Sequence, residues 1–342
     1  MANLVNSIKP EIARIALVGC GPISNFHVDA VNGVGMRVTD VAASKNSVTV
    51  GSFASKFDIP NVWKDPEQLI LEGSWDGLVL AAPTKAMLPL LTLAISRNLP
   101  VLVEKPVAMS SFALDSIQGN PQQVMVAYNR RFYPKIQELK QILQISKPAL
   151  ISVEIPEKLL PSSTGALNEI YSGVIQNSAH MFDIIRFLAG ALEIVFVDSP
   201  GDRKRELGSL MVLRSEHGHL ISLKMNYQAS ANFSITADID TKRYSLLPLE
   251  LLSIYDGMNV VEPTQEVPVR SYKPQLQSQL RSDPSEFKYK PGFLGQAQAF
   301  KELMLGEPSS YMAHLDDTRK ALQIAEILIN PLNQLPFPIK IN

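Results

Sequence analysis

The first part of the chain alternates short, wholly apolar runs with longer segments of helical periodicity. The apolar runs end near Val18, Ala82 and Val103, and each intervening segment is long enough for a helix. Strands that alternate with helices form parallel βαβ units, and wholly apolar strands suit a sheet covered on both faces. The pattern predicts a doubly wound parallel sheet over residues 1–127, with its ligand at the carboxyl ends of the strands.

The pattern changes from Leu150 onward, where short strand-like runs follow one another with turn signals between them. Helical periodicity returns near Gly295. We therefore expect a second α/β domain, rich in strands, over residues 128–342. Two stretches, 157–171 and 271–290, show little periodicity and are expected to be loops that shape a substrate pocket.

A single amphipathic helix is predicted over residues 175–190. Gln176, His180 and Asp183 share one face of it at helical spacing. A histidine on such a face is either an ordinary surface group or a proton-transfer group in a cleft, and the helix alone does not decide. The opposite, apolar face consists of Met181, Ile184, Ile185 and Leu188.

The first apolar run leads into a Gly-x-Gly turn and then a helix, the arrangement of a dinucleotide-binding fingerprint. Gly19 allows the tight turn, and Gly21 lets the backbone approach a pyrophosphate at the start of the helix, where Pro22 and Ile23 follow. Ser24 takes the third fingerprint position and is small enough for close helix–strand packing. The alternative is a glycine turn that binds nothing.

The second strand is expected to end at Ser44 and Lys45, where an acid would hold the ribose hydroxyls of NAD. Asp40 lies too early, inside the strand. A hydroxyl followed by a cation suits a 2′-phosphate, so NADP(H) is favoured over NAD(H). In the alternative, Lys45 is solvated and backbone groups hold the ribose.

Composition narrows the class of protein. The chain has 342 residues, 46% hydrophobic and 19% charged, with a net charge of −1, which is typical of a globular protein and argues against nucleic acid or an anionic membrane as a partner. Cys20 is the only cysteine, which excludes an internal disulfide and fits a reducing compartment. The N-terminus lacks the order of a signal peptide, and charges and prolines interrupt the most apolar region, so a cytoplasmic protein is expected.

The tripeptide Glu104-Lys105-Pro106, after the fifth strand, resembles the signature of the Gfo/Idh/MocA family, the glucose–fructose oxidoreductase and inositol dehydrogenase group of NAD(P)-dependent sugar oxidoreductases. Other landmarks occur in the family order. They are VGCGPIS, AAPT, VMVAYNRRFYP, HMFDIIRFLAG and the closing GFLGQAQAFKELMLGEP, so the likeness spans nearly the whole chain.

The resemblance implies a Rossmann domain followed by an α/β domain with a large open, mostly antiparallel sheet, and an active site between them. The last helices can return to the first domain. The open sheet is commonly used by the family to form dimers or tetramers, so a homodimer or homotetramer is expected. The implied reaction is hydride transfer between the nicotinamide and a secondary alcohol or ketone of a sugar, sugar nucleotide or polyol.

The resemblance also assigns roles to individual residues. Lys105 would polarise the reacting oxygen, and His180 would donate or accept the proton. The substrate-binding candidates are Asn129, Arg131, Gln176, Asn177 and Asp183. The cofactor-binding candidates, besides the glycine turn with Ser44 and Lys45, are Ala82, Pro83, Thr84, Glu104, Lys105 and Arg130.

Plainer alternatives stand beside several of these roles. Asp183 could fix its helix or meet a cation, and Asn177 could cap the helix instead of binding substrate. One of the two arginines, Arg130 or Arg131, is expected in an interdomain salt bridge. His27 is expected on the surface or in the packing of the first helix.

One position departs from the family. Polyol-oxidising members carry an aspartate four residues before the histidine, and Gln176 stands there in this chain. Glutamine can hydrogen-bond but cannot take a proton. The alternative to an enzyme is therefore a dinucleotide-binding regulator or pseudoenzyme of the same fold. No metal is expected, because His217 and His219 flank a hairpin glycine and have no cysteine nearby.

Overall fold

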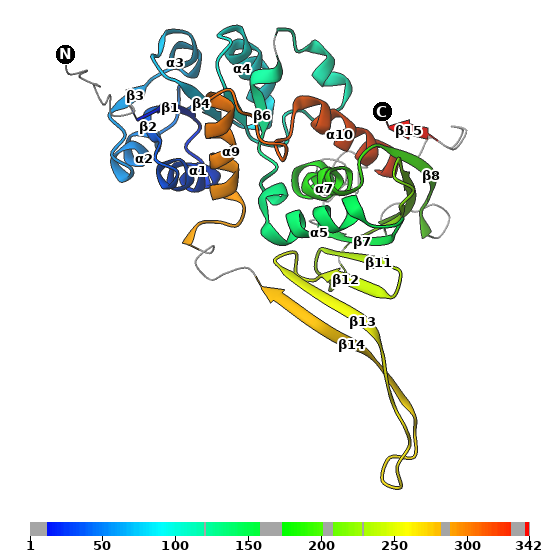
Figure 1. Cartoon of the computed structure of the whole chain (residues 1–342). Coiled ribbons are helices and arrows are strands. Elements are labelled where there is room, and N and C mark those ends of the chain that lie inside the picture. The colour runs from blue at the N-terminus through cyan, green and yellow to red at the C-terminus, as the bar shows by residue number, and fades with distance from the viewer. Residues whose placement is uncertain are drawn as a thin grey trace, which may run out of the picture. The chain divides into compact units, whose positions relative to one another are not determined.

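The computed structural model describes residues 12–119, 121–157, 173–200, 208–227, 229–281, 288–329 and 339–341. The chain divides into two compact units (Figure 1). The first comprises residues up to Ala108, Asp115–Ala127 and Phe293–Leu315. The second comprises Met109–Leu114, Tyr128–Gly292 and the residues from Asp316 onward.

The first unit contains a six-stranded parallel sheet in the order β3-β2-β1-β4-β5-β6. This is the strand order of a Rossmann fold, as the alternating pattern predicted. Its strands are β1 (Arg14–Val18), β2 (Arg37–Ala42), β3 (Asn61–Trp63), β4 (Gly77–Leu80), β5 (Val101–Val103) and β6 (Val124–Val126). Its helices are α1 (Pro22–Gly33), α2 (Val50–Lys56), α3 (Pro66–Glu72), α4 (Thr84–Ser96) and, from later in the chain, α9 (Phe293–Met304).

Local chemistry explains where these elements begin. The strands β4, β5 and β6 are buried at every position, because helices cover both faces of a parallel sheet. Pro22 occupies the first position of α1, where its missing N–H costs nothing. Asp65 caps α3 by accepting a hydrogen bond from the Glu67 backbone N–H at 3.0 Å.

The helix α9 joins the first unit although it lies more than 160 residues after β6 in the sequence. Phe293 and Ala297 pack against Ala30 of α1 in one buried cluster. Lys301 donates a hydrogen bond from Nζ to the carbonyl of Val34, which follows α1, at 2.8 Å. Apolar contact and this hydrogen bond therefore hold α9 on α1.

The second unit contains a nine-stranded sheet in the order β14-β13-β12-β11-β7-β10-β9-β8-β15. Only the β7–β10 pair is parallel, so the expected mostly antiparallel sheet is confirmed. The strands are β7 (Leu150–Glu157), β8 (Leu192–Asp198), β9 (Gly208–Ser215), β10 (Leu220–Tyr227), β11 (Ser234–Ile239), β12 (Lys242–Leu246), β13 (Leu251–Val261), β14 (Ser271–Arg281) and β15 (Ile339–Ile341).

Helices accompany this sheet in the same unit. In β7, Ile151, Val153 and Ile155 are buried while the residues between them are not, as expected of a sheet with one covered face. Its described α-helices include α5 (Pro134–Ile145), α7 (Ala179–Ala189) and α10 (Leu315–Ile329). The described residues also form short 3-10 helices: η1 (Phe112–Ser116) at the boundary of the two units, η2 (Pro121–Gln123) in the first unit and η3 (Asn129–Phe132) in the second.

Two sequence expectations for the second unit are wrong. Residues 271–281 form the strand β14 instead of a loop. This strand is exposed along nearly its whole length, so no buried face imposes an alternating pattern on its sequence. The single helix expected over 175–190 is interrupted by a turn at Ser178, and α7 begins at Ala179. The expected loop 157–171 begins at the last residue of β7 and otherwise lies outside the described residues.

The hairpin of β13 and β14 extends beyond the rest of its sheet as a two-stranded ribbon (Figure 1). The strand β12 pairs with β13 only as far as Asp256, so residues 257–261 have β14 as their only neighbour in the sheet. Within the described part of the chain, no helix combines the length and the apolar character needed to cross a membrane.

Candidate active site

The turn after β1 is held against the neighbouring strand by its first glycine. Gly19 has φ +113°, and a Cβ built on it would lie 2.2 Å from the carbonyl oxygen of Ala81. Its N–H donates a hydrogen bond to the carbonyl of Ala42 at 2.8 Å. Only glycine combines this conformation with so close an approach. The turn is therefore tight for the reason that the fingerprint predicted.

The second glycine begins α1 and leaves space in front of it. Gly21 is the N-cap of α1, and a Cβ built on it would meet nothing within 4 Å. No side chain caps the helix. Pro22 has no N–H and the N–H of Ser24 donates to the carbonyl of Gly21 at 3.0 Å, so the helix offers an anion mainly the positive end of its dipole. Pro22 and Ile23 form the first turn, and Ser24 is fully buried at the close-packing position. The residues present thus fit the pyrophosphate of a dinucleotide.

Backbone hydrogen bonds join the turns that follow three parallel strands. The N–H of Ala81 donates to Val18, and that of Glu104 donates to Leu80, each at 2.8 Å. The carboxyl ends of β1, β4 and β5 are consequently fixed at one edge of the sheet. This edge brings together the predicted cofactor residues Gly19, Gly21, Pro22, Ile23, Ala82, Pro83, Thr84, Glu104 and Lys105.

The ribose end of the candidate site differs in detail from the expectation. The strand β2 ends at Ala42, before the exposed Ser44 and Lys45. Lys45 extends Nζ to within 2.8 Å of Asp65 Oδ2, although its side chain is 72% exposed. The hydrogen bond with Asp65 raises the pKa of Lys45, so this lysine is a stable cation. Asp40 lies inside β2, as predicted.

A buried histidine that sequence reasoning left to packing touches the family tripeptide. His27 on α1 places Nε2 2.8 Å from Glu104 Oε1. The other carboxylate oxygen, Oε2, accepts a hydrogen bond from the backbone N–H of Lys105 at 3.1 Å. The pair is separated by 77 residues, so no local sequence signal could have joined it.

In the second unit, Arg131 and Asp183 are partners of each other. Arg131 donates from Nε to Oδ2 at 2.8 Å and from Nη2 to Oδ1 at 2.6 Å, and Nη2 lies 3.3 Å from Asp317. All three residues belong to the second unit, so this is not the interdomain salt bridge that was expected of one arginine. Asp183 meets a cation, which is the plainer of its two predicted roles.

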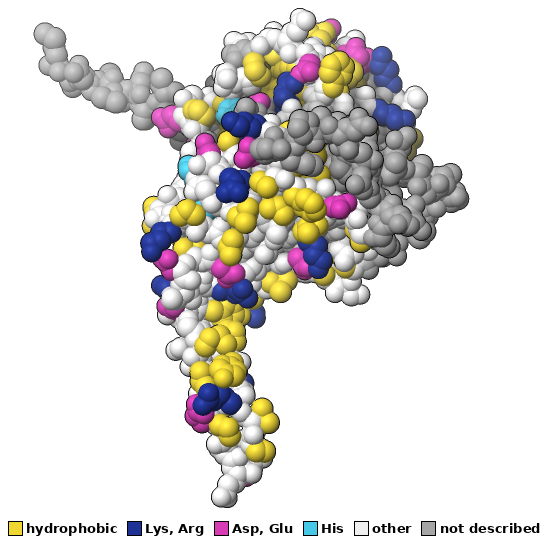
Figure 2. Space-filling model, turned by 90° about the vertical axis from the view of Figure 1, so that its right-hand side faces the viewer, with side chains coloured by type: hydrophobic (Ala, Val, Ile, Leu, Met, Phe, Trp, Pro, Cys, Tyr) yellow, Lys and Arg dark blue, Asp and Glu magenta, His cyan; other side chains and the backbone are white. Residues whose placement is uncertain are grey.

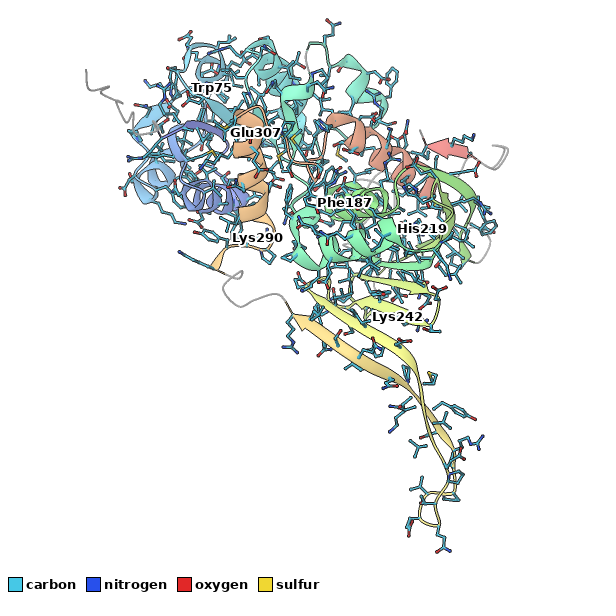
Figure 3. The ribbon with its side chains drawn as sticks, viewed as in Figure 1. Trp75, Phe187, His219, Lys242, Lys290 and Glu307 are labelled. Atoms are coloured by element: carbon cyan, nitrogen blue, oxygen red, sulfur yellow. The ribbon has the colours of Figure 1, made fainter. Side chains whose placement is uncertain are left out.

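Burial and charge act on this cluster together. Burial raises the pKa of Asp183 to about 6, while Arg131 pulls it down and the nearby charge of Asp317 adds to the rise. The guanidinium of Arg131 also lies over the ring of Phe187, 5.1 Å from its centroid. Phe187 lies on α7 and is labelled in Figure 3. Two carboxylates thus share one buried cation, which ties η3 to α7 and α10.

The neighbours of Arg131 in sequence have different surroundings. Asn129 is buried and donates from Nδ2 to the carbonyl of Pro291 at 2.8 Å. Arg130 places its guanidinium over the ring of Phe233, 4.8 Å from the centroid. Burial lowers the pKa of Arg130 against the opposing influence of nearby acids. Both residues are therefore anchored within the second unit.

His180 is buried near the start of α7, with 8% of its surface exposed. Its ring meets that of Tyr128 edge-on, with centroids 5.8 Å apart. Gln176 is exposed and lies on the other side of the turn at Ser178. The two side chains therefore differ in burial, and a face shared by Gln176 and His180 stays a prediction.

A carboxylate missed by the sequence reasoning lies at the same turn. Glu157, the last residue of β7, is 4% exposed and accepts a hydrogen bond from Asn177 Nδ2 at 3.0 Å. It also accepts from the hydroxyl of Ser178, the N-cap of α7, whose side chain makes no capping bond itself. Asn177 is thus bonded to Glu157, and the start of α7 rests on a buried acid.

The two hairpin histidines differ from each other. His217 is exposed, whereas His219 is buried and accepts a hydrogen bond at Nδ1 from the backbone N–H of Ala149 at 3.0 Å. Among the described residues, no group of three or more His, Cys, Asp or Glu side chains is arranged to hold a metal ion.

Comparisons with known proteins agree with this arrangement. Residues 13–128 match the model of the GFO_IDH_MocA family, described as an oxidoreductase family with an NAD-binding Rossmann fold. The chain is 24% identical over 300 residues to inositol 2-dehydrogenase 2 of Saccharopolyspora erythraea, covering 79% of this chain and 82% of that protein. It is 22% identical over 240 residues to inositol 2-dehydrogenase of Corynebacterium glutamicum, covering 66% and 70%.

Solved structures share the fold over nearly the whole chain. Levoglucosan dehydrogenase, solved with NADH and levoglucosan, has a TM-score of 0.72 at 14% identity, covering 93% of this chain and 96% of that one. Apo scyllo-inositol dehydrogenase from Lactobacillus casei has a TM-score of 0.68 at 15% identity, covering 97% and 98%.

Proposed function

Because residues 13–128 match the model of an oxidoreductase family with an NAD-binding Rossmann fold, and the relatives of the chain include inositol dehydrogenases, we propose that it transfers hydride between a nicotinamide dinucleotide and a secondary alcohol or ketone of a sugar, sugar nucleotide or polyol. One observation carries the proposal most directly. The open glycine turn at the start of α1 and the Glu104-Lys105 turn lie at the same edge of the parallel sheet. The nicotinamide supplies the hydride chemistry, and the chain must hold the reactants and manage one proton.

Lys105 is the proposed cation at the reacting oxygen. It follows β5 at the carboxyl edge of the sheet, and its backbone N–H is bonded to the Glu104 carboxylate. An ammonium placed where alkoxide character develops stabilises that charge in the transition state. Lys105 would therefore act as the polarising group in either direction of the reaction.

His180 is the proposed proton donor or acceptor, because an imidazole exchanges protons near neutral pH. Its burial near the start of α7 fits a group that works away from bulk water. Among the substrate-binding candidates, Asn129, Arg131 and Asp183 have protein partners and would shape the pocket indirectly. Asn177 likewise has a protein partner in Glu157, and Gln176 is exposed on the other side of the turn at Ser178.

For the cofactor we propose NADP(H) over NAD(H). The segment after β2 offers Ser44 and a lysine whose positive charge Asp65 stabilises. A 2′-phosphate would exchange one anionic partner of Lys45 for another. The test compares kcat/KM for NADPH and NADH in the wild type and in Lys45→Ala. The variant should lose preference for NADPH by about tenfold, the value of one charged contact. An unchanged ratio would contradict the assignment.

We also propose a homodimer or homotetramer formed through the open sheet of the second unit. Figure 2 shows hydrophobic side chains gathered on this sheet and along the ribbon of β13 and β14. Patches of this kind mark interaction surfaces. The exposed residues include Leu150, Leu210 and Leu220 on the sheet and Met258, Val260 and Tyr272 on the ribbon.

Light scattering during gel filtration tests the assembly. Leu220→Glu is expected to give a smaller species, because a charge on the covered face would have to be desolvated. Val48→Glu is the matched control, since Val48 is 94% exposed in the first unit. A monomeric wild type would refute the proposal.

A regulator that binds the dinucleotide without turning over is the second candidate, and Gln176 in the family's aspartate position favours it. The deciding experiment assays oxidation and reduction on a panel of sugars and polyols for wild type and Lys105→Ala. An enzyme should show turnover that the variant loses by at least about a hundredfold. Tight NADPH binding by the wild type with no turnover on any substrate would instead establish the regulator.

A further inference from the structure

His27 and Glu104 form a buried acid–base pair inside the first unit. His27 is 2% exposed and Glu104 8%, and Nε2 lies 2.8 Å from Oε1. A carboxylate is an acceptor when ionised, so the imidazole donates its Nε2 proton to it. The proposed reaction uses neither side chain as a proton donor or acceptor, and burying both is costly unless they are hydrogen-bonded to each other, as they are here.

The second oxygen of the same carboxylate binds the backbone of the next residue. Glu104 Oε2 accepts the backbone N–H of Lys105 at 3.1 Å. Two hydrogen bonds therefore link the imidazole of His27, through the carboxylate of Glu104, to the backbone of Lys105. Rotation of the carboxylate would break both hydrogen bonds, so the histidine fixes the orientation on which the second bond depends.

Aromatic packing holds the imidazole itself. The ring of Phe293, the first residue of α9, lies 5.1 Å from the His27 ring at an angle of 59°. Phe26 also packs against Phe293, with ring centroids 5.8 Å apart. Since α9 is anchored on α1, the imidazole is held between the ring of Phe293 and the carboxylate of Glu104.

We propose that His27 is a positioning residue for Lys105: through Glu104 it fixes the backbone from which the lysine side chain reaches the reacting oxygen. The proposal rests on the proposed function, in which Lys105 polarises that oxygen. A displacement of about 1 Å in a reacting group can cost roughly a hundredfold in rate. A long, flexible lysine side chain depends on a fixed backbone for that accuracy.

Two variants separate positioning from simple packing. His27→Leu keeps a buried side chain but removes the hydrogen bond, whereas His27→Gln retains an amide donor near the position of Nε2. We expect kcat to fall about tenfold to a hundredfold in His27→Leu, with KM and cofactor Kd changed less than about threefold, and to recover within about fivefold of wild type in His27→Gln. Equal losses in both variants, or a loss confined to KM, would overturn the proposal.

A double variant asks whether His27 acts through the lysine. If it does, His27→Leu should lower kcat no further in a Lys105→Ala background. Additive losses would mean that His27 acts independently and would overturn the proposal. His219→Leu is the matched control, because it removes another buried histidine with one 3.0 Å hydrogen bond, in the second unit.

Hydrogen exchange gives a readout that needs no turnover. In the apo protein, the Lys105 amide should exchange at least about tenfold faster in His27→Leu than in wild type, with β1 amides of the same unit unchanged. His219→Leu should leave the Lys105 amide unaltered. Uniformly faster exchange throughout the unit, or none at Lys105, would overturn the proposal. If the wild type turns nothing over, the proposed function fails while this exchange experiment still decides the role of His27.

Discussion

Arg131 and Asp183 make a two-point ion pair in the interior of the second unit, with side chains only 5% and 1% exposed. The pair joins η3 to α7, the helix that carries His180. Breaking one side of such a pair leaves an uncompensated buried charge, which is far more costly than losing a surface contact. The position of α7 beside η3 therefore depends on both residues.

The first prediction concerns the stability of this pair. Asp183→Asn should lower the free energy of unfolding at pH 7 by about 3 kcal/mol, because Arg131 loses its bidentate anion and keeps the more distant Asp317. Asp238→Asn, which breaks the exposed Arg243–Asp238 pair, is the matched control and should cost less than about 1 kcal/mol. Urea unfolding followed by fluorescence measures both. Similar losses in the two variants would contradict the prediction.

The shared cation also predicts a pH dependence. The pKa of Asp183 is raised from 3.8 to about 6, so between these values the folded chain binds more protons than the unfolded chain. The free energy of unfolding should therefore fall as the pH rises from about 4 to about 6, by about 1 kcal/mol for each pH unit, because ionising Asp183 is less favourable in the folded chain than in the unfolded chain. In Asp317→Asn this slope should be shallower, because one neighbouring negative charge is gone. Thermal unfolding from about pH 4 to 7 measures both slopes, and an identical slope would refute the cause assigned.

Alanine substitutions of the two glycines of the turn should affect different properties, thermal stability for Gly19 and cofactor binding for Gly21. Gly19→Ala places a Cβ 2.2 Å from the Ala81 carbonyl at a positive φ, so the apo protein should lose several degrees in Tm. Gly21→Ala meets no atom within 4 Å and should leave the apo Tm within about a degree. Its methyl group would instead stand where a pyrophosphate approaches, so NADPH binding should weaken at least about tenfold. Unimpaired binding by Gly21→Ala would contradict this placement of the cofactor.

Much of the fold could be predicted because the elements of the first unit have clear signals in a few consecutive residues. The wholly apolar runs of β4 and β5 indicate strands, and the Gly19–Gly21 turn indicates the start of a helix. The ribbon strand β14 could not be predicted, since its side chains are exposed on both faces and its partner β13 supplies backbone hydrogen bonds that leave no pattern in the sequence.

The contacts of the candidate site could be predicted less well. The roles of Lys105 and His180 stay predictions, and the contacts of His27 with Glu104 and of Arg131 with Asp183 join residues 77 and 52 positions apart. Such contacts depend on the packed structure and are invisible to local spacing. The turn at Ser178 was hidden for the same reason, because the acid that bonds there comes from β7.

Substitutions of the buried Glu157 and of the exposed Gln176 should differ in their effects on stability and kcat. Glu157→Gln offers one acceptor oxygen to two donors, Asn177 and Ser178, so it should cost about 1–3 kcal/mol and loosen the start of α7. If that helix positions His180 for proton transfer, kcat should fall about tenfold with it. Gln176→Asp puts a carboxylate on an exposed residue on the other side of the turn at Ser178, so it should change stability by less than about 0.5 kcal/mol and kcat by less than about threefold. Unfolding curves and steady-state kinetics of the two variants measure both effects. A large gain in kcat from Gln176→Asp would instead show that this position reaches His180 and that a carboxylate there takes part in the proton transfer.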